Sequence, residues 1–343
     1  MEELKADIQE ALGPAYRVER ELGGGGMSRV FVAEETALAR KVVVKVLPPD
    51  MAAGVNAERF RREIQLAASL QHPHIVPLIA AGQKGDLVWY TMPLVEGESL
   101  REKIERDGRL PLPAVMKILR DVVDALAYAH SRCIVHRDIK PDNVLISHDH
   151  GQVTDFGVAK AVSQAATGAT LTSAGLAIGT PAYMAPEQAA GDPNVDHRSD
   201  IYAAGLLAYE MLIGRPAFDG PSPHAVLAAQ LTEPPAPIER SRPDVPRHLA
   251  AIIMRCLEKD VGRRWQSAAE LRAALDGVAT PVTPVSTPAR PRSRAGLLAA
   301  IALLALAGTG AWLVAAKRGA DRRALATAVA VFPFEVRGSP EVA

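Results

Sequence analysis

Two short polar segments near the middle of the chain carry residue types that could do chemistry together. The sequence is HRDIKPDN at residues 136–143 and DFG at residues 155–157. In the first segment an acid, a lysine two positions later and a carboxamide five positions later could align a hydroxyl with a phosphorus atom and steady its oxygens. The acid of the second segment could complete a site for a hard cation, which prefers carboxylate and amide oxygens. These residue types and their spacing indicate phosphoryl transfer.

The two segments also fit the patterns H-R-D-x-x-x-x-N and D-F-G at the spacing of protein kinases. From about residue 16 to 276 the chain resembles a bacterial serine/threonine protein kinase of the eukaryotic-like (Hanks) type. The resemblance implies an α+β, bilobal fold with a β-rich N-terminal lobe and a mainly helical C-terminal lobe. It also implies ATP and Mg²⁺ as cofactors. Asp138 would be the catalytic base, Lys140 would contact the γ-phosphate, and Asn143 and Asp155 would hold Mg²⁺.

A lysine also lies inside an apolar run. Residues 41–47 (KVVVKVL) are rich in β-branched side chains and are followed by two prolines, so we expect a buried strand. A lysine in such a strand is costly to bury unless it is paired. By resemblance Lys45 contacts the α- and β-phosphates, and Glu63, in a helix expected over 55–70, pairs with it. Glu58 is the rival for that pairing.

A glycine-rich segment and a hinge complete the implied nucleotide site. Residues 22–30 fit G-x-G-x-x-G-x-V with Ser28 in the third glycine's place, although four glycines in a row are by themselves typical of a flexible hairpin. Glycines let the backbone approach phosphates closely. The run at 87–92 predicts a strand that leads into the hinge. The implied nucleotide-binding residues are Leu22, Gly23, Gly24, Gly25, Gly26, Met27, Ser28, Val30, Val43, Lys45, Met92, Pro93, Val95, Asn143, Leu145 and Asp155.

Within that set, each hinge residue has an implied part. Met92 would be the gatekeeper, the carbonyl of Pro93 an acceptor and the N–H of Val95 a donor to the adenine edge; proline keeps its carbonyl, so the acceptor is retained. Leu145 would form the floor of the adenine pocket. Val43 stands where the family has alanine, which narrows the pocket.

Arg137, next to the proposed base, bears on regulation. In the family an arginine at this position marks kinases whose activation loop is ordered by phosphorylation, because phosphate offers the guanidinium bidentate partners. The loop runs over 155–187, and we expect autophosphorylation there, with Thr172 and Thr170 favoured; a merely solvated polar loop is the alternative. The segment GTPAYMAPE at 179–187 resembles the substrate-docking segment of protein kinases. The implied regulatory residues are Arg137, Thr170, Thr172, Ser173 and Thr180.

Residues 113–132 have the apolar spacing of a long amphipathic helix that leads to the catalytic loop. Two contacts in the C-terminal lobe follow from the resemblance. Asp200, at the start of an apolar helix that continues to Ile213, would brace the catalytic loop. Arg264 would pair with Glu187, the last residue of the APE motif.

Composition excludes some classes of protein and site. The 343 residues contain 39 Lys+Arg and 39 Asp+Glu, so no bulk charge indicates a nucleic-acid partner. Two cysteines far apart in sequence, without a CxxC pattern or a Cys/His cluster, argue against a disulfide framework and against a zinc site, and we expect Cys133 to be a small buried hydrophobe. For the histidines of the HPH segment at 72–74 we favour a role in a turn over metal binding.

The C-terminal part has a different composition. A proline-rich linker is expected at 277–295, and residues 296–316 form a 21-residue stretch without a charge, long enough for a transmembrane helix. Basic residues flank it on both sides, so the positive-inside rule does not set the orientation. The N-terminus lacks a signal peptide, and we therefore expect a single-pass cell-membrane protein with a cytoplasmic kinase domain. The small-xxx-small pairs of residues 296–316 would suit a homodimer for trans-autophosphorylation, although an alanine-rich stretch produces such pairs by chance.

The remaining pieces are an N-terminal extension at 1–15, in which residues 4–12 could form a short amphipathic helix, and an extracytoplasmic tail at 317–343. The AVAVFPF run of the tail resembles the first strand of a truncated, TolB-like sensor domain. We expect phosphorylation of Ser and Thr residues of proteins in transmembrane signalling. A catalytically weak pseudokinase or scaffold that binds nucleotide and partners is the alternative, which the retained acids, lysines and carboxamide disfavour. A small-molecule kinase is disfavoured by the 179–187 segment.

Overall fold

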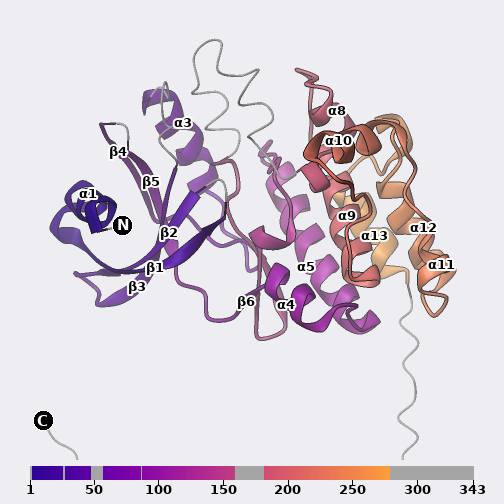
Figure 1. Ribbon diagram of the computed structural model, residues 1–343, viewed down its shortest axis with the longest axis horizontal. Coiled ribbons are helices and arrows are strands. Elements are labelled where there is room, and N and C mark those ends of the chain that lie inside the picture. The colour runs from indigo at the N-terminus through magenta and orange to yellow at the C-terminus, as the bar shows by residue number, and fades with distance from the viewer. Residues whose placement is uncertain (1, 26–27, 48–56, 86, 159–180, 279–343) are drawn as a thin grey trace, which may run out of the picture. The chain divides into compact units, whose positions relative to one another are not determined.

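The computed structural model describes residues 2–25, 28–47, 57–85, 87–158 and 181–278 (Figure 1). The predicted transmembrane helix at 296–316 and the tail at 317–343 lie outside these residues, as does the linker beyond residue 278. Across the part of the chain that is described, no helix is both long and apolar enough to cross a bilayer.

The smaller lobe is built on an antiparallel sheet with the strand order β1-β2-β3-β5-β4. The strands are β1 (Tyr16–Gly25), β2 (Ser28–Glu35), β3 (Arg40–Val46), β4 (Ala80–Lys84) and β5 (Leu87–Pro93). The apolar runs at 41–47 and 87–92 therefore form β3 and β5, as the sequence predicts. These two strands are neighbours, and Lys45 lies directly opposite Tyr90 in their register.

One helix covers each face of this sheet, because successive side chains of a strand point to opposite faces. Val42, Val44 and Val46 of β3 pack with α1 (Glu2–Leu12), whose Ile8 is fully buried. Val43 lies on the other face, in a cluster with Phe60 of α3 (Ala57–Ala68). The N-terminal extension thus contributes a helix to the core of the lobe, followed by the short 3-10 helix η1 (Gly13–Ala15).

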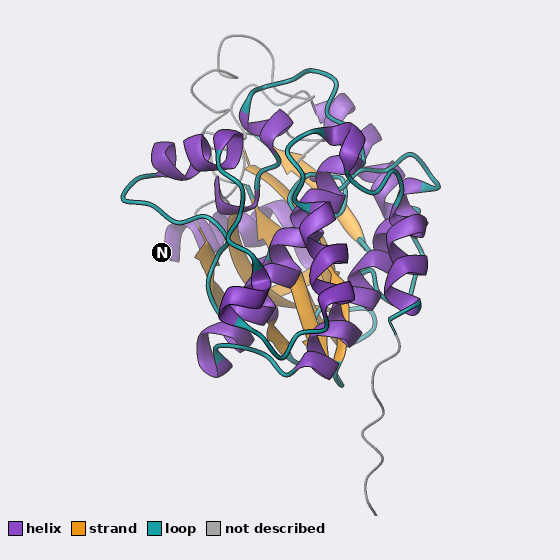
Figure 2. Cartoon of the chain, turned by 90° about the vertical axis from the view of Figure 1, so that its right-hand side faces the viewer, coloured by secondary structure: helices purple, strands orange, loops and turns teal. Residues whose placement is uncertain are grey.

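The larger lobe is mainly helical, and Figure 2 shows its helices in front of the strands. Its small sheet contains β6 (Glu98–Ser99), β7 (Val144–Ser147) and β8 (His150–Val153). Its helices are α4 (Leu100–Asp107), α5 (Leu112–His130), α8 (Pro186–Ala189), α9 (Arg198–Ile213), α10 (Pro223–Thr232), α11 (Ile238–Ser241), α12 (Arg247–Cys256) and α13 (Ala268–Asp276). The 3-10 helices are η2 (Pro141–Asn143), η3 (Pro181–Tyr183) and η4 (Val261–Arg263).

A single apolar core holds this lobe together. Helix α9 is buried from Ser199 to Ile213 and packs against α5 and α12. Helix α5 also packs against α13 and β8, so it links the helices to the small sheet. The predicted α+β, bilobal fold is confirmed. One prediction is wrong: Cys133 is exposed, in a left-handed turn (φ 58°) just after α5.

Candidate active site

Asp155 is held by two side chains of the smaller lobe. The Lys45 ammonium lies 2.5 Å from its Oδ2, and the Tyr90 hydroxyl donates a 2.9 Å hydrogen bond to its Oδ1. Both partners come from the same register position of β3 and β5. The predicted strand lysine and the predicted metal-binding acid, 110 residues apart in sequence, are therefore in direct contact.

The charge state of Asp155 follows from these contacts. Burial by itself would raise its pKa, but the nearby charge of Lys45 and the hydrogen bonds from Lys45 and Tyr90 outweigh it, and the pKa lies below 3.8. Burial, followed by the negative charge of Asp155, raises the pKa of Tyr90 well above 10. At neutral pH the site therefore contains an ionised carboxylate and a neutral phenol that donates to it.

The residues of the catalytic-loop pattern also contact one another. The Lys140 ammonium lies 2.9 Å from Asp138 Oδ2. The Asn143 amide nitrogen donates to the Asp138 backbone carbonyl at 2.8 Å and to Oδ2 at 3.0 Å. An acid thus stands between a cation and a carboxamide, and the pair of bonds from Asn143 fixes its orientation.

The loop and Asp155 are joined at the ends of β7 and β8. Asn143 precedes β7, Thr154 follows β8, and the Thr154 N–H donates to the Asn143 carbonyl at 2.9 Å. Asn143 uses its amide nitrogen on Asp138, which leaves its side-chain oxygen as a ligand atom. That oxygen and the carboxylate of Asp155 are the hard donors that Mg²⁺ prefers, so these residues fit the implied cation.

Asp200 braces the catalytic loop through hydrogen bonds to its backbone, as predicted. Its Oδ1 accepts from the Arg137 N–H at 2.7 Å, and its Oδ2 accepts from the His136 N–H at 2.8 Å. His130 Nε2 lies 2.9 Å from Oδ2. Burial would raise the pKa of Asp200, but the hydrogen bonds and the charges of the histidines lower it below 3.8. The turn at Arg137 has φ 70°, and the carboxylate holds this strained backbone in place.

The predicted adenine-pocket residues lie in one apolar cluster. Val43 and Met92 are buried in it, and Val30, Val95 and Leu145 pack against them. They come from β2, β3, β5, the segment after β5 and β7. The structure therefore brings together these apolar residues that the resemblance assigns to the adenine pocket, and Pro93 ends β5 opposite Val42.

The glycine-rich segment forms the hairpin between β1 and β2. Gly23, Gly24 and Gly25 pair with Val30, Arg29 and Ser28, with a bulge between Glu21 and Gly23. Gly23 has φ +117°, a conformation that glycine adopts without strain. Leu22 is exposed. Gly26 and Met27 lie outside the described residues.

Comparison with known proteins identifies this arrangement. A model of the protein kinase domain matches residues 16–274. The chain belongs to the protein kinase family. Its kinase domain is 41% identical over 267 residues to the serine/threonine-protein kinase pkn2 of Myxococcus xanthus, an alignment that covers 76% of this chain and 32% of pkn2.

Two other relatives have similar sequence identity to this chain. Identity is 41% over 270 residues to PknB of Mycolicibacterium smegmatis, covering 77% of this chain and 43% of the relative. It is 38% over 270 residues to PrkC of Bacillus subtilis, covering 78% and 41%. Both are named serine/threonine-protein kinases. The chain therefore spans less than half the length of these relatives.

The kinase fold is also seen in a solved structure. The crystal structure of Rad53 residues 1–466 in complex with AMP-PNP superposes with a TM-score of 0.62 at 24% sequence identity, covering 75% of this chain and 64% of that one. At this identity the similarity concerns the fold alone.

Helix α3 carries Glu63 and packs against the DFG turn. A Cβ atom on Gly157 (φ +71°) would lie 3.0 Å from the Ala67 Cβ, so the helix and the turn approach closely. Phe60 and Ile64 are buried on the same side of α3. In this structure Lys45 bonds to Asp155, and the Lys45–Glu63 pair stays a prediction.

The predicted regulatory residues divide into two groups. Thr170, Thr172, Ser173 and Thr180 lie outside the described residues. Arg137 is half-buried; its Nη2 donates to the Val195 carbonyl at 3.3 Å, and its buried Nε finds no hydrogen-bond partner in the described parts of the chain.

The predicted pairing of Arg264 with Glu187 is confirmed. Arg264 is fully buried and makes two parallel bonds of 2.7 Å to the carboxylate of Glu187. This bidentate pair joins α8 to the segment before α13.

Tyr90 is the site residue that sequence reasoning missed. The pattern does contain a signal, because Tyr90 lies two positions before Met92 and strand side chains alternate between faces. Once Met92 is placed at the pocket, Tyr90 must point to the same face. Its contact with Asp155 depends on how the two lobes meet, which no local pattern specifies.

Proposed function

We propose that this protein transfers the γ-phosphoryl group of ATP to Ser and Thr hydroxyls of proteins. The supporting observations are two groups of contacts: Lys45 bonds to Asp155, and Asn143 and Lys140 bond to Asp138. The hydrogen bond from the Thr154 N–H to the Asn143 carbonyl joins the two segments. These five side chains are the parts that phosphoryl transfer needs. Their presence favours a catalytically active kinase over a nucleotide-binding scaffold without turnover.

The chain's own residues divide the work. Asp138, held by Asn143, is placed to orient a hydroxyl and accept its proton. Lys140, on the same carboxylate, can neutralise charge on the transferred phosphoryl group, and Lys45 can do so for the preceding phosphates. Asn143 and Asp155 would hold Mg²⁺, which neutralises the phosphate oxygens when bound.

The test is phosphate incorporation from labelled ATP by the purified full chain. We expect Asp138→Asn to lower the rate by on the order of 10² to 10⁴-fold, the usual loss for a general base. The matched control is Asp142→Asn in the same loop, whose side chain is 51% exposed. Equal rates for wild type and Asp138→Asn would refute the assignment of the base.

We also propose that phosphorylation of the activation loop raises activity, through Arg137. The support is its cationic side chain, which has no carboxylate within ion-pair distance among the described residues and could therefore donate hydrogen bonds to a phosphate group. Replacing Thr170, Thr172 and Ser173 together by Ala should lower phosphorylation of an added protein substrate. Unchanged activity would contradict this role.

The membrane anchor is a proposal that rests on the sequence alone. We propose that residues 296–316 cross the cell membrane once, leave the kinase domain in the cytoplasm and permit a homodimer for trans-autophosphorylation in transmembrane signalling. Deletion of residues 296–343 should release the protein from washed membranes. Continued sedimentation of the shortened chain with membranes would contradict the anchor.

A further inference from the structure

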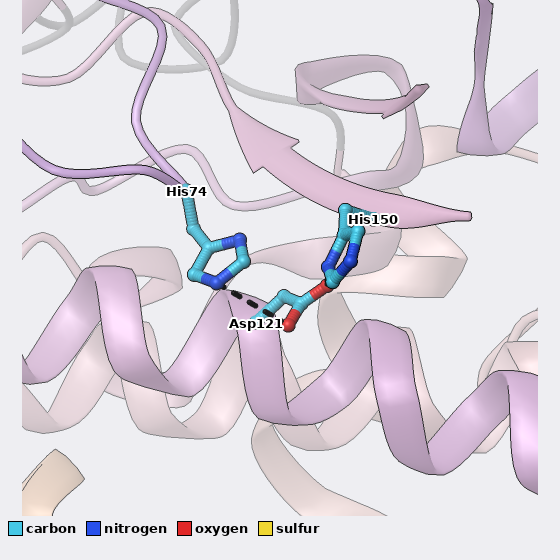
Figure 3. A group of neighbouring side chains, drawn as sticks. All are labelled: His74, Asp121 and His150. Carbon is cyan, nitrogen blue, oxygen red and sulfur yellow. Dashed lines mark hydrogen bonds and ion pairs between the residues drawn. The ribbon is translucent and has the colours of Figure 1, made fainter. Parts of the chain in front are cut away.

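Three side chains that have no part in the proposed active site lie together beside α5 (Figure 3). They are His74, Asp121 and His150. His74 lies in the segment between α3 and β4, Asp121 is on α5, and His150 begins β8. His74 Nε2 is 3.4 Å from Asp121 Oδ1, and His150 Nδ1 is 3.2 Å from Asp121 Oδ2. One candidate ligand atom from each residue lies within 4.8 Å of the other two.

The hydrogen bonds around the cluster fix which atoms face inward. His74 Nδ1 lies 3.0 Å from the Gly151 carbonyl, which can only accept, so Nδ1 carries the proton. The Gly151 N–H donates to Asp121 Oδ2 at 2.9 Å, which leaves Oδ1 toward His74. In the neutral imidazole the Nε2 lone pair therefore faces a carboxylate oxygen.

Two acceptors that face each other repel unless a cation lies between them. The cation is either a second proton on His74 or a metal ion. A histidine that donates its other N–H to a backbone carbonyl has the arrangement typical of metal-binding histidines, because the bond fixes the ring and directs the free nitrogen at the ion. Asp121 has a side chain only 11% exposed, so its orientation is fixed as well.

The donor set favours one metal. Two imidazole nitrogens and one carboxylate oxygen suit zinc, whereas Mg²⁺ and Ca²⁺ prefer oxygen alone. Tetrahedral ligands at about 2.0–2.2 Å from zinc lie roughly 3.3–3.5 Å apart, and the 3.4 Å between His74 Nε2 and Asp121 Oδ1 is in this range. His150 lies nearer the other oxygen of Asp121, and the three ligand atoms are within 4.8 Å of one another. The His150 side chain is 53% exposed, so its ring can turn toward the ion and solvent can supply the fourth ligand.

We propose that His74, Asp121 and His150 form a zinc site that fastens the segment between α3 and β4 to the larger lobe. The backbone is already paired there: the Val153 N–H donates to the His74 carbonyl and the Val76 N–H to the Val153 carbonyl, both at 2.9 Å. A bound zinc ion adds a link from the same segment to α5. The site therefore controls how firmly the chain leaving α3 is held.

The test measures zinc binding by the full chain, stripped of metal with a chelator and titrated with Zn²⁺ against a chromophoric competitor. Excess Mg²⁺ is present, so that the active-site carboxylates do not take up zinc. We expect one tight site per chain in the wild type. His150→Ala should weaken it on the order of 100-fold or more, since even the loss of a supporting residue costs 10- to 100-fold.

Two further variants separate ligation from folding. His248→Ala removes another exposed histidine and should leave zinc affinity unchanged, whereas Asp121→Asn should weaken it as His150→Ala does. Hydrogen exchange of residues 72–79 should slow on zinc addition in the wild type and remain unchanged in His150→Ala. If His150→Ala binds zinc as tightly as the wild type, or the wild type shows no site, the proposal is wrong and the cation at His74 is a proton.

Discussion

Two buried carboxylates show how position and charge are set residue by residue. Asp155 and Asp200 are both ionised because hydrogen bonds and nearby cations outweigh the cost of burial. The donors to Asp200 come from the larger lobe, to which it belongs, so its place is fixed by one core. The donors to Asp155 come from the smaller lobe. The position of the proposed metal ligand therefore depends on the contact between the lobes.

Tyr90→Phe tests that dependence. The substitution removes a hydrogen bond to a charged, buried carboxylate, an interaction worth about 1.5–3 kcal/mol. We expect kcat/KM for ATP to fall by about tenfold or more, because Asp155 loses one of the two groups that orient it. Steady-state kinetics at saturating Mg²⁺ measure the effect.

The control for this change is Tyr16→Phe, since Tyr16 packs on the opposite face of the sheet, beneath α1. It should leave the kinetics unchanged. A tenfold loss in both variants would mean that Tyr90 acts through the stability of the sheet rather than through Asp155.

At this scale the sequence predicts side chains whose role is tied to spacing along the chain. Lys140 and Asn143 follow Asp138 on one loop, and the structure places all three in contact. The prediction that Cys133 is buried is wrong, because it rests only on the average preference of cysteine for buried positions. A left-handed turn after α5 directs it to solvent instead.

Among the elements, helix α1 shows what periodicity can and cannot indicate. The apolar spacing of residues 4–12 predicts an amphipathic helix, and α1 is observed at Glu2–Leu12. Periodicity gives the apolar face but not its partner, so the segment was interpreted as an extension. The partner is the face of the sheet that carries Val42, Val44 and Val46, which α3 leaves uncovered.

Ile8→Ala tests whether α1 is part of the core. Ile8 is 0% exposed, and removing such a side chain costs about 2–5 kcal/mol of unfolding free energy through lost burial and the cavity left behind. Leu38→Ala removes a similar side chain that is 65% exposed and should change stability by no more than about 0.5 kcal/mol. Urea unfolding measures both, and equal effects would mean that α1 does not contribute to the stability of the lobe.

For the molecule as a whole, the segments that meet are separated by long stretches of sequence. Arg264 and Glu187 could be paired in advance because both belong to patterns of the family. The contact of Tyr90 with Asp155 and the cluster of His74, Asp121 and His150 could not, since each joins elements whose distance depends on the complete packing. The turn predicted for the HPH histidines is observed, since the Ile75 N–H donates to the His72 carbonyl at 3.1 Å. The local pattern could not show that the His74 side chain lies beside Asp121 of α5 and His150 of β8.

Asp200 connects the catalytic loop to global stability, and its pKa gives that link a sign. Because the folded-state pKa lies below the ordinary value of 3.8, the carboxylate's contribution is fully present above about pH 4 and is lost as pH falls through the folded-state value. Wild-type stability should therefore be nearly independent of this group from pH 7 to 5 and decline in more acid solution.

Asp200→Asn places an amide N–H₂ against a backbone N–H donor and removes the buried charge that faces His130. We expect it to cost about 3 kcal/mol at pH 7 and to reduce the acid decline. Unfolding free energies of both proteins at pH 7, 5 and 3.5 measure this, and a variant that loses stability in acid as steeply as the wild type would show that Asp200 is not a source of the decline.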